Sequence, residues 1–71
     1  MLAARVDRVT EKRVSMGFSK IDLARACGVS HSIIVRIEKG EGTSPKTAKA
    51  ISEALSMPVL DLFEIKRRVI A

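Results

Sequence analysis

The side chains best suited to chemistry in this sequence are hydrogen-bond donors. His31, Ser32 and Arg36 fall on the polar face of a short helix predicted at residues 31–38. A guanidinium fork matches the O6 and N7 acceptors of guanine, and an imidazole or a hydroxyl can bind a base edge or a phosphate. Val35, beside them, can contact a thymine methyl. This set predicts a helix that reads DNA base edges, with phosphate contact as the alternative for each polar side chain.

A helix, a glycine turn and a second helix position these side chains. Ser19 and Asp22 can form a capping box at the start of the first helix. Gly28 ends that helix, because glycine adopts the left-handed conformation without steric cost, and Ser30 can cap the next helix. Apolar residues at helical spacing are expected to face inward: Ile21, Leu23, Ala24, Cys27, Ile34 and Ile37. This layout is typical of a DNA-reading helix-turn-helix.

The remaining segments predict three further helices. Residues 1–16 carry apolar residues three and four apart and are expected to form one helix. Residues 39–45 are rich in glycine and hydroxyl side chains, which predicts a loop. Residues 45–56 predict a fourth helix, which Ser44 can cap, and a short fifth helix is expected from Val59.

These elements predict an all-α fold class, a compact five-helix domain. Residues 1–71 are expected to form a single domain with its core at about residues 5–63. The short basic and apolar tail, residues 64–71, either extends the fifth helix or is loosely ordered.

Composition narrows the classes of function. The formal net charge is +5 and the isoelectric point is about 10.0, which favours a polyanionic partner such as nucleic acid, although a basic surface can also serve solubility alone. One cysteine, Cys27, makes no internal disulfide, which is typical of a cytoplasmic protein. The sequence has no membrane-spanning run, no metal-ligand set and no nucleophile paired with a base. We therefore expect no enzyme activity, no cofactor and no membrane partner.

Four fragments resemble one family. They are DRVTEKRVSMGFSK at residues 7–20, LARACGVS at 23–30, RIEKG at 36–40 and ALSMPVLDLF at 54–63. Together, in this order, they resemble the lambdoid phage repressor and Cro (Xre-type) helix-turn-helix family. The resemblance implies a repressor-like fold and a sequence-specific regulator of transcription. Such a regulator binds a double-stranded operator as a homodimer through the recognition helix, residues 31–38, with no small-molecule effector expected.

The resemblance also assigns roles to single residues. The family joins its first helix to the end of the recognition helix by an arginine–glutamate pair, which implies a pair between Arg13 and Glu38. Arg13 interrupts an apolar stripe and so needs a partner unless it is solvated. Many relatives carry glutamine where this sequence has Lys20 and His31. Lysine cannot accept a hydrogen bond, so adenine recognition is not expected to carry over.

A second group of residues is expected to contact the DNA backbone. The backbone N–H groups of Thr43 and Ser44, at the start of the fourth helix, form the expected phosphate clamp. Lys46 matches a position where relatives place a basic residue near the backbone or minor groove. Lys20 is expected at a phosphate, and Ser30, at the start of the recognition helix, completes the predicted DNA-binding set.

The sequence leaves more than one kind of protein partner open. The expected dimer surface consists of the apolar residues Met57, Leu60, Ile65 and Val69, unless Ile65 and the tail fold onto the chain's own core. A regulator of this kind can repress by covering a promoter or activate by contacting RNA polymerase. One alternative function is an antitoxin that binds a toxin through the tail and regulates its own operon. Another is an adaptor without DNA binding.

Overall fold

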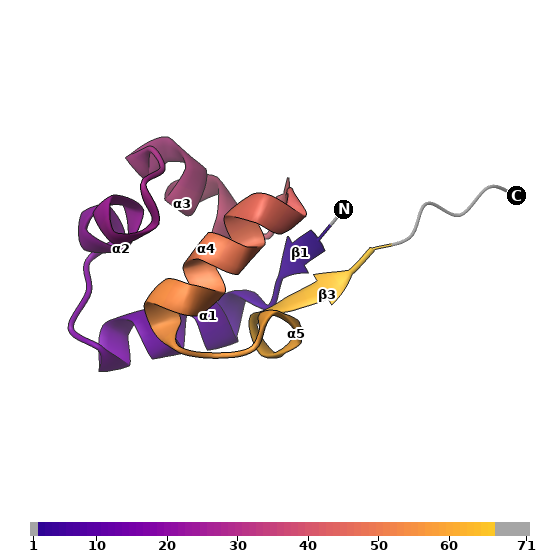
Figure 1. Ribbon diagram of the computed structural model, residues 1–71, viewed down its shortest axis with the longest axis horizontal. Helices are drawn as coiled ribbons and strands as arrows, with labels where there is room; N and C mark the ends of the chain where they lie inside the picture. Colours follow the sequence, from indigo (N-terminus) through magenta and orange to yellow (C-terminus); the bar gives the residue numbers. More distant parts are fainter. Residues whose placement is uncertain (1, 67–71) are drawn as a thin grey trace, which may run out of the picture.

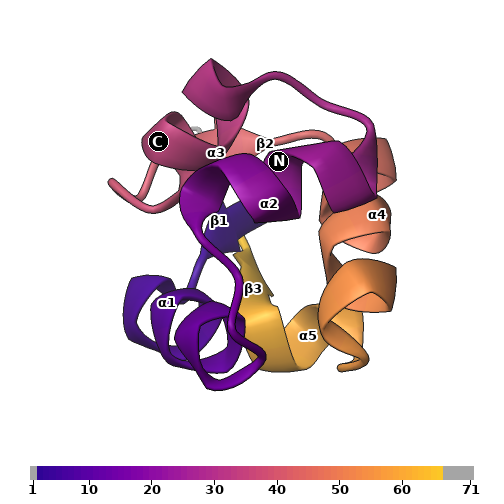
Figure 2. The ribbon, with the colours of Figure 1, turned by 90° about the vertical axis from the view of Figure 1, so that its left-hand side faces the viewer.

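A computed structural model describes residues 2–66 of the chain. Helices α1 (Val6–Ser15), α2 (Lys20–Cys27), α3 (His31–Ile37), α4 (Pro45–Leu55) and α5 (Val59–Leu62) surround one core (Figure 1). Three short strands, β1 (Leu2–Ala4), β2 (Gly42–Thr43) and β3 (Phe63–Ile65), form an antiparallel sheet in the order β2-β1-β3. Figure 2 shows α2 and α3 together at one side of the molecule, with α1 and α5 at the other.

Local sequence signals set the helix ends. Ser19 and Asp22 form the predicted capping box, and Gly28 ends α2 in the left-handed conformation with φ 71°. The Ser30 hydroxyl accepts the N–H of Ile33 at the start of α3, and Ser44 caps α4 in the same way. The predictions for these helix starts are therefore confirmed.

The Asp22 carboxylate makes the α2 cap sensitive to pH. It accepts the Ser19 N–H at 3.0 Å, and this hydrogen bond, together with that of the Ser19 side chain, lowers the pKa of Asp22 below its ordinary value of 3.8. A lowered pKa in the folded state stabilises the protein above pH 3.8, and this stabilisation is lost as the pH falls through the folded-state pKa. We expect Asp22→Asn to be less stable than wild type near pH 7 and the difference to vanish in acid. Thermal melts from pH 7 to strong acid test this, and a difference that persists in acid would contradict it.

The prediction of an all-α fold with one helix over residues 1–16 is wrong at the N-terminus. Leu2–Ala4 form β1, and the helix begins only at Val6. The β1 residues pair with β3, where Ala4 lies opposite Phe63 and Leu2 opposite Ile65. The residue pairs of this ladder are about sixty positions apart, so local periodicity could not indicate the strand.

Two other segments also join the sheet. The predicted loop at residues 39–45 contains β2, which pairs with β1. The first two residues of the predicted tail, Glu64 and Ile65, belong to β3 and do not extend α5. The chain leaves the helix at Phe63, which has extended backbone angles and a fully buried side chain. Val69 lies outside the described residues.

The core is aliphatic apart from Phe63, and half-buried Phe18 packs against it. The prediction that Ile21 faces the core is wrong, since Ile21 is 48% exposed. The other inward residues of α2 and α3 pack as expected, with Cys27 only half-buried. Fully buried side chains from all five described helices and from β3 form the centre: Val9, Leu23, Ile34, Ile51, Leu55, Leu62 and Phe63.

Candidate nucleic-acid interface

Helix α3 has one buried side and one exposed polar side. Ile34 and Ile37 are buried in the core, whereas His31, Ser32 and Arg36 are exposed. The spacing of the two isoleucines therefore fixes which side chains α3 presents to solvent. Val35 is half-buried at the border between the two sides. The exposed side carries donors from the first residue of the helix to its last turn, as a helix in the major groove requires.

Helix α2 packs against α3. The Val29 N–H donates to the Ala24 carbonyl at 3.0 Å, which closes the turn after Gly28. Leu23 and Ala24 are buried against the same core as Ile34. The turn is therefore fixed by backbone bonds and by packing. Lys20, the first residue of α2, is half-buried.

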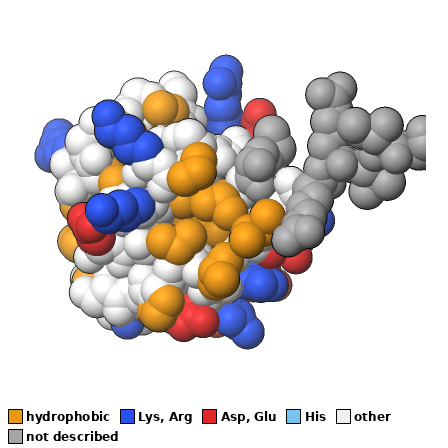
Figure 3. Space-filling view, turned by 45° about the vertical axis from the view of Figure 1, so that its right-hand side comes forward, with side chains coloured by type: hydrophobic (Ala, Val, Ile, Leu, Met, Phe, Trp, Pro, Cys, Tyr) orange, Lys and Arg blue, Asp and Glu red, His pale blue; other side chains and the backbone are white. Residues whose placement is uncertain are grey.

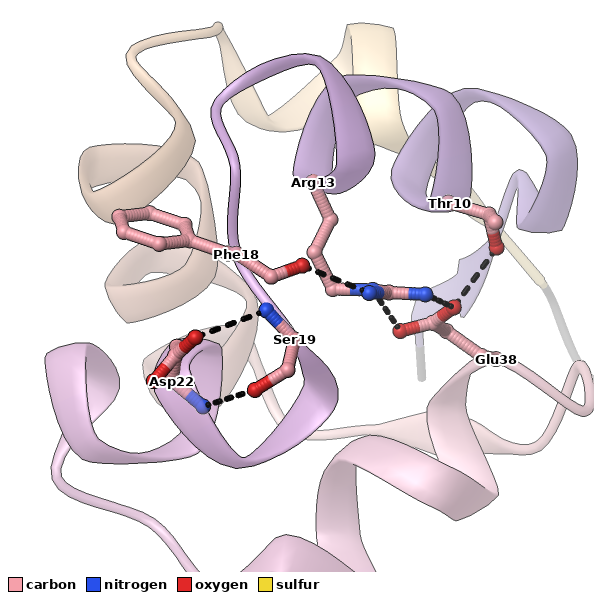
Figure 4. Close-up of polar contacts among 6 residues, drawn as sticks. All are labelled: Thr10, Arg13, Phe18, Ser19, Asp22 and Glu38. Atoms are coloured by element: carbon pink, nitrogen blue, oxygen red, sulfur yellow. Dashed lines mark hydrogen bonds and ion pairs between the residues drawn. The ribbon is translucent and has the colours of Figure 1, made fainter.

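A buried ion pair fixes the end of α3 to α1. Arg13 Nε donates to Glu38 Oε2 at 2.8 Å, and Arg13 Nη2 donates to Glu38 Oε1 at 3.1 Å. The two side chains are 10% and 5% exposed, respectively. This is the pair that the family resemblance implied, and its bidentate geometry is the strong form of such a contact. Figure 4 shows the Arg13 side chain reaching from α1 to Glu38, the residue that ends α3.

Two more contacts complete the ion pair, and the sequence did not indicate either. The Thr10 hydroxyl donates to Glu38 Oε1 at 2.7 Å, and Arg13 Nη1 donates to the Phe18 carbonyl at 2.8 Å (Figure 4). In the described part of the chain, no buried side-chain nitrogen or oxygen lacks a hydrogen-bond partner. Three segments therefore meet at this network: α1, the turn before α2, and the end of α3. The only sequence signal for Thr10 is its position three residues before Arg13.

The last turn of α3 faces β2 and the start of α4 across a shallow hollow of about 280 Å³. The Glu41 N–H donates to the Arg36 carbonyl at 3.1 Å and turns the chain back toward the sheet. Arg36, Thr43 and Ser44 therefore line one hollow, together with the carboxylate-bearing Glu41. This brings the predicted base-reading arginine and the predicted phosphate-binding loop to one surface. Lys46, exposed in the first turn of α4, follows directly after that loop.

The family assignment agrees with this geometry. The model of a helix-turn-helix family matches residues 9–62, from α1 to the end of α5. This chain belongs to the Cro/C1-type helix-turn-helix family. The family is one of DNA-binding regulators, and the match spans the ion pair, α2, α3 and the loop before α4. A search of curated proteins found no match to this chain.

Strand β2 changes the role available to Thr43 in this helix-turn-helix domain. Thr43 lies opposite Leu2 in the β1–β2 pair. The Arg5 N–H donates to the Leu62 carbonyl, at the end of α5, at 2.7 Å. In an antiparallel ladder the backbone groups of successive residues alternate between the two neighbouring strands. The backbone groups of Ala3 therefore face β3, as those of Arg5 do, and the backbone groups of Leu2 face β2. The backbone of Thr43 is thus directed toward β1. By the same alternation the N–H of Ser44 is directed away from β1, so Ser44 and Lys46 are the predicted backbone-contact residues of this segment whose donors the sheet does not occupy.

The predicted dimer residues lie on different elements. Leu60 on α5 is 57% exposed and Ile65 on β3 is 56% exposed. Met57 is half-buried and packs against the core. Ile65 lies in the sheet opposite Leu2, but its side chain remains largely outside the core. Of the two alternatives, folding onto the chain's own core therefore holds for the backbone of Ile65 and not for its side chain.

Cys27 carries the one thiol of residues 2–66. Cys27 is half-buried, and this burial raises the pKa of its thiol, which makes it less reactive. Within this range, no three side chains of His, Cys, Asp or Glu are grouped so that they could hold a metal ion. The described helices are also too short or too polar to cross a membrane.

Proposed function

We propose that this helix-turn-helix protein is a sequence-specific regulator that binds a double-stranded operator and represses transcription by covering a promoter. The observation that carries the proposal is the exposed face of α3. It presents His31, Ser32 and Arg36 to solvent while the opposite side of the helix is held by the core and by the Arg13–Glu38 pair. A rigidly held helix with exposed donors suits the major groove, where each base pair shows its own donor and acceptor pattern.

The residues around α3 support a matching set of backbone contacts. Lys20 begins α2, Ser30 precedes α3, and Ser44 and Lys46 lie beyond its other end. The Ser30 hydroxyl accepts the Ile33 N–H, which leaves its own proton available for a phosphate oxygen. Contacts from these residues to phosphates would hold the base-reading helix in register along the groove.

A homodimer is the second part of the proposal. One recognition helix contacts only a few base pairs, and two-fold dimers read two half-sites about one helical turn apart, roughly 34 Å. The exposed Leu60 and Ile65 support a surface for a second copy. The antitoxin alternative depends on residues 66–71, of which only Lys66 is described, so no observation favours it.

Selection of bound duplexes from random DNA with the full chain tests the proposal. We expect enrichment of a palindromic site whose half-sites lie about one turn apart. An Arg36→Ala chain that passes through the same selection serves as the matched control and should give a weaker preference at a defined base pair in each half-site. Uniform, salt-sensitive binding of all duplexes by the wild-type chain would refute sequence-specific regulation.

Lys46 is expected to contribute affinity without sequence preference. Replacing it with alanine should weaken binding to specific and random duplexes by similar factors, and lower the slope of log K against log salt by about one. Titrations at several salt concentrations measure this slope. Lys49→Ala is the matched control, because Lys49 lies on the same helix and is engaged with Glu53 at 4.0 Å. A changed base preference with an unchanged slope would contradict the assigned role.

A further inference from the structure

Strand β3 is an edge strand. Within residues 2–66 the sheet order β2-β1-β3 places β1 in the centre, so β3 is paired on one side. An unpaired strand edge presents N–H and C=O groups that can bind another strand. The last residue of β3, Ile65, adds a side chain that is 56% exposed. Figure 3 shows hydrophobic side chains gathered on the face that comes forward when the sheet side of the molecule is turned toward the viewer.

The pairing with β1 fixes which backbone groups face this edge. The Arg5 N–H donates to the Leu62 carbonyl, and the β1–β3 ladder continues in the same register. In an antiparallel ladder, alternate residues direct both backbone groups to the same neighbour. Glu64 therefore directs its N–H and C=O toward β1, whereas Phe63 and Ile65 direct theirs to the unpaired edge.

We propose that β3 pairs with β3 of a second copy of this chain, antiparallel and across a two-fold axis, so that one sheet runs through both protomers. This inference deepens the homodimer of the proposed function and rests on it. A two-fold interface uses the same surface on both copies, and an edge strand that meets its own copy in antiparallel orientation satisfies this condition. In Figure 1, α2 and α3 lie at the opposite end of the molecule from β3, so pairing at β3 leaves both recognition helices uncovered.

Charge selects the register of this pairing. Two-fold symmetry requires one residue to lie opposite its own copy, and like charges directly opposite each other are destabilising. Centring the pair on Glu64 or on Lys66 sets like charges against each other. Centring it on Phe63 sets the partner's β3 against the end of α5, which offers no strand edge.

Centring the pair on Ile65 avoids both conflicts. Ile65 then lies opposite the partner's Ile65, and Glu64 lies opposite the partner's Lys66, twice by symmetry. Ile65 is one of the residues whose backbone groups face the unpaired edge, so the central pair can exchange two hydrogen bonds. Within one chain, Lys66 Nζ already lies 2.7 Å from Glu64 Oε1, and this hydrogen bond keeps the pKa of Glu64 below its ordinary value of 4.5. Glu64 therefore presents a full negative charge at neutral pH.

Sedimentation of the full chain without DNA tests the pairing. We expect a concentration-dependent dimer in the wild type. Lys66→Glu turns two opposite-charge pairs into like-charge pairs and should weaken the dimer roughly tenfold or more. The exchange variant Glu64→Lys/Lys66→Glu should restore dimerisation. Lys49→Glu makes the same change in net charge at an exposed position of α4 and should leave dimerisation unchanged. Circular dichroism checks that each variant is folded.

Cysteine cross-linking tests the register. In a Cys27→Ala background, Ile65→Cys should form a disulfide-linked dimer, because residues opposite each other in a hydrogen-bonded pair have Cα atoms about 5.5 Å apart. Glu64→Cys should cross-link much less. A monomer at all concentrations, a dimer indifferent to Lys66→Glu, or preferential cross-linking at position 64 would overturn the inference. Specific DNA binding by such a monomer would refute the β3 pairing and support the proposed function as a regulator. A β3-paired dimer without base preference would support the pairing and refute sequence-specific regulation.

Discussion

Replacing Glu38 with alanine is expected to lower the free energy of unfolding by roughly 3–5 kcal/mol. The substitution leaves the Arg13 guanidinium buried, with a side chain only 10% exposed, and removes the acceptor of its two bidentate hydrogen bonds. The Thr10 hydroxyl loses its acceptor as well. A core as small as this one supplies only a few kcal/mol of stability, so we expect the variant to be largely unfolded at 37 °C. Chemical denaturation followed by circular dichroism measures the change.

Three further variants separate the causes of this effect. Arg13→Met combined with Glu38→Leu removes both charges and should recover most of the lost stability, because the uncompensated buried charge is then absent. Thr10→Val should cost about 1 kcal/mol for one hydrogen bond. Glu53→Ala, which breaks the exposed pair with Lys49, should change stability by less than about 0.5 kcal/mol. A wild-type melting temperature for Glu38→Ala would show that Arg13 does not need its partner.

Arg36→Ala is expected to give the largest loss of sequence discrimination. Arg36 is exposed in the last turn of α3, and a bidentate contact with guanine contributes about 1–3 kcal/mol of discrimination against the wrong base. The preference for the selected site over a single-base variant should therefore fall about 5- to 150-fold at the contacted position. Competition titrations with the selected duplex and its single-base variants measure this ratio at fixed salt.

Two other substitutions distinguish a base contact from a phosphate contact. Arg36→Lys retains the charge but not the planar fork, so it should lose discrimination while keeping most of the non-specific affinity. Arg25→Ala removes an exposed arginine from neighbouring α2 and should leave the base preference unchanged. Equal weakening of all duplexes by Arg36→Ala, with Arg36→Lys close to wild type, would assign Arg36 to a phosphate instead.

The helix-turn-helix was predictable because its signals are local. Ser19, Asp22, Gly28 and Ser30 act within three or four residues of the groups they satisfy, so their roles follow from spacing alone. The inward isoleucines of α3 follow from helical periodicity in the same way. Periodicity failed for Ile21, because a helix of eight residues at the surface can carry an apolar side chain outside its buried face.

The sequence predicted which residues could form the interface but not how they lie relative to one another. The sequence indicated donors on α3 and a loop able to bind phosphate. The structure brings Arg36 and Ser44 to one hollow and places Glu41 there too, which local patterns could not show. It also directs the backbone of Thr43 into the sheet.

By itself, the sequence determined the caps of α2, α3 and α4, the face that α3 presents and, through family resemblance, the partner of Arg13. Only the tertiary structure decided the sheet, because its strands are two or three residues long and are held by hydrogen bonds between residues distant in the chain. Such strands are too short to show a period of two, and Ala3 and Ala4 favour a helix when judged locally. The third contact of Glu38, from Thr10, likewise exists only because α1 and the end of α3 pack together.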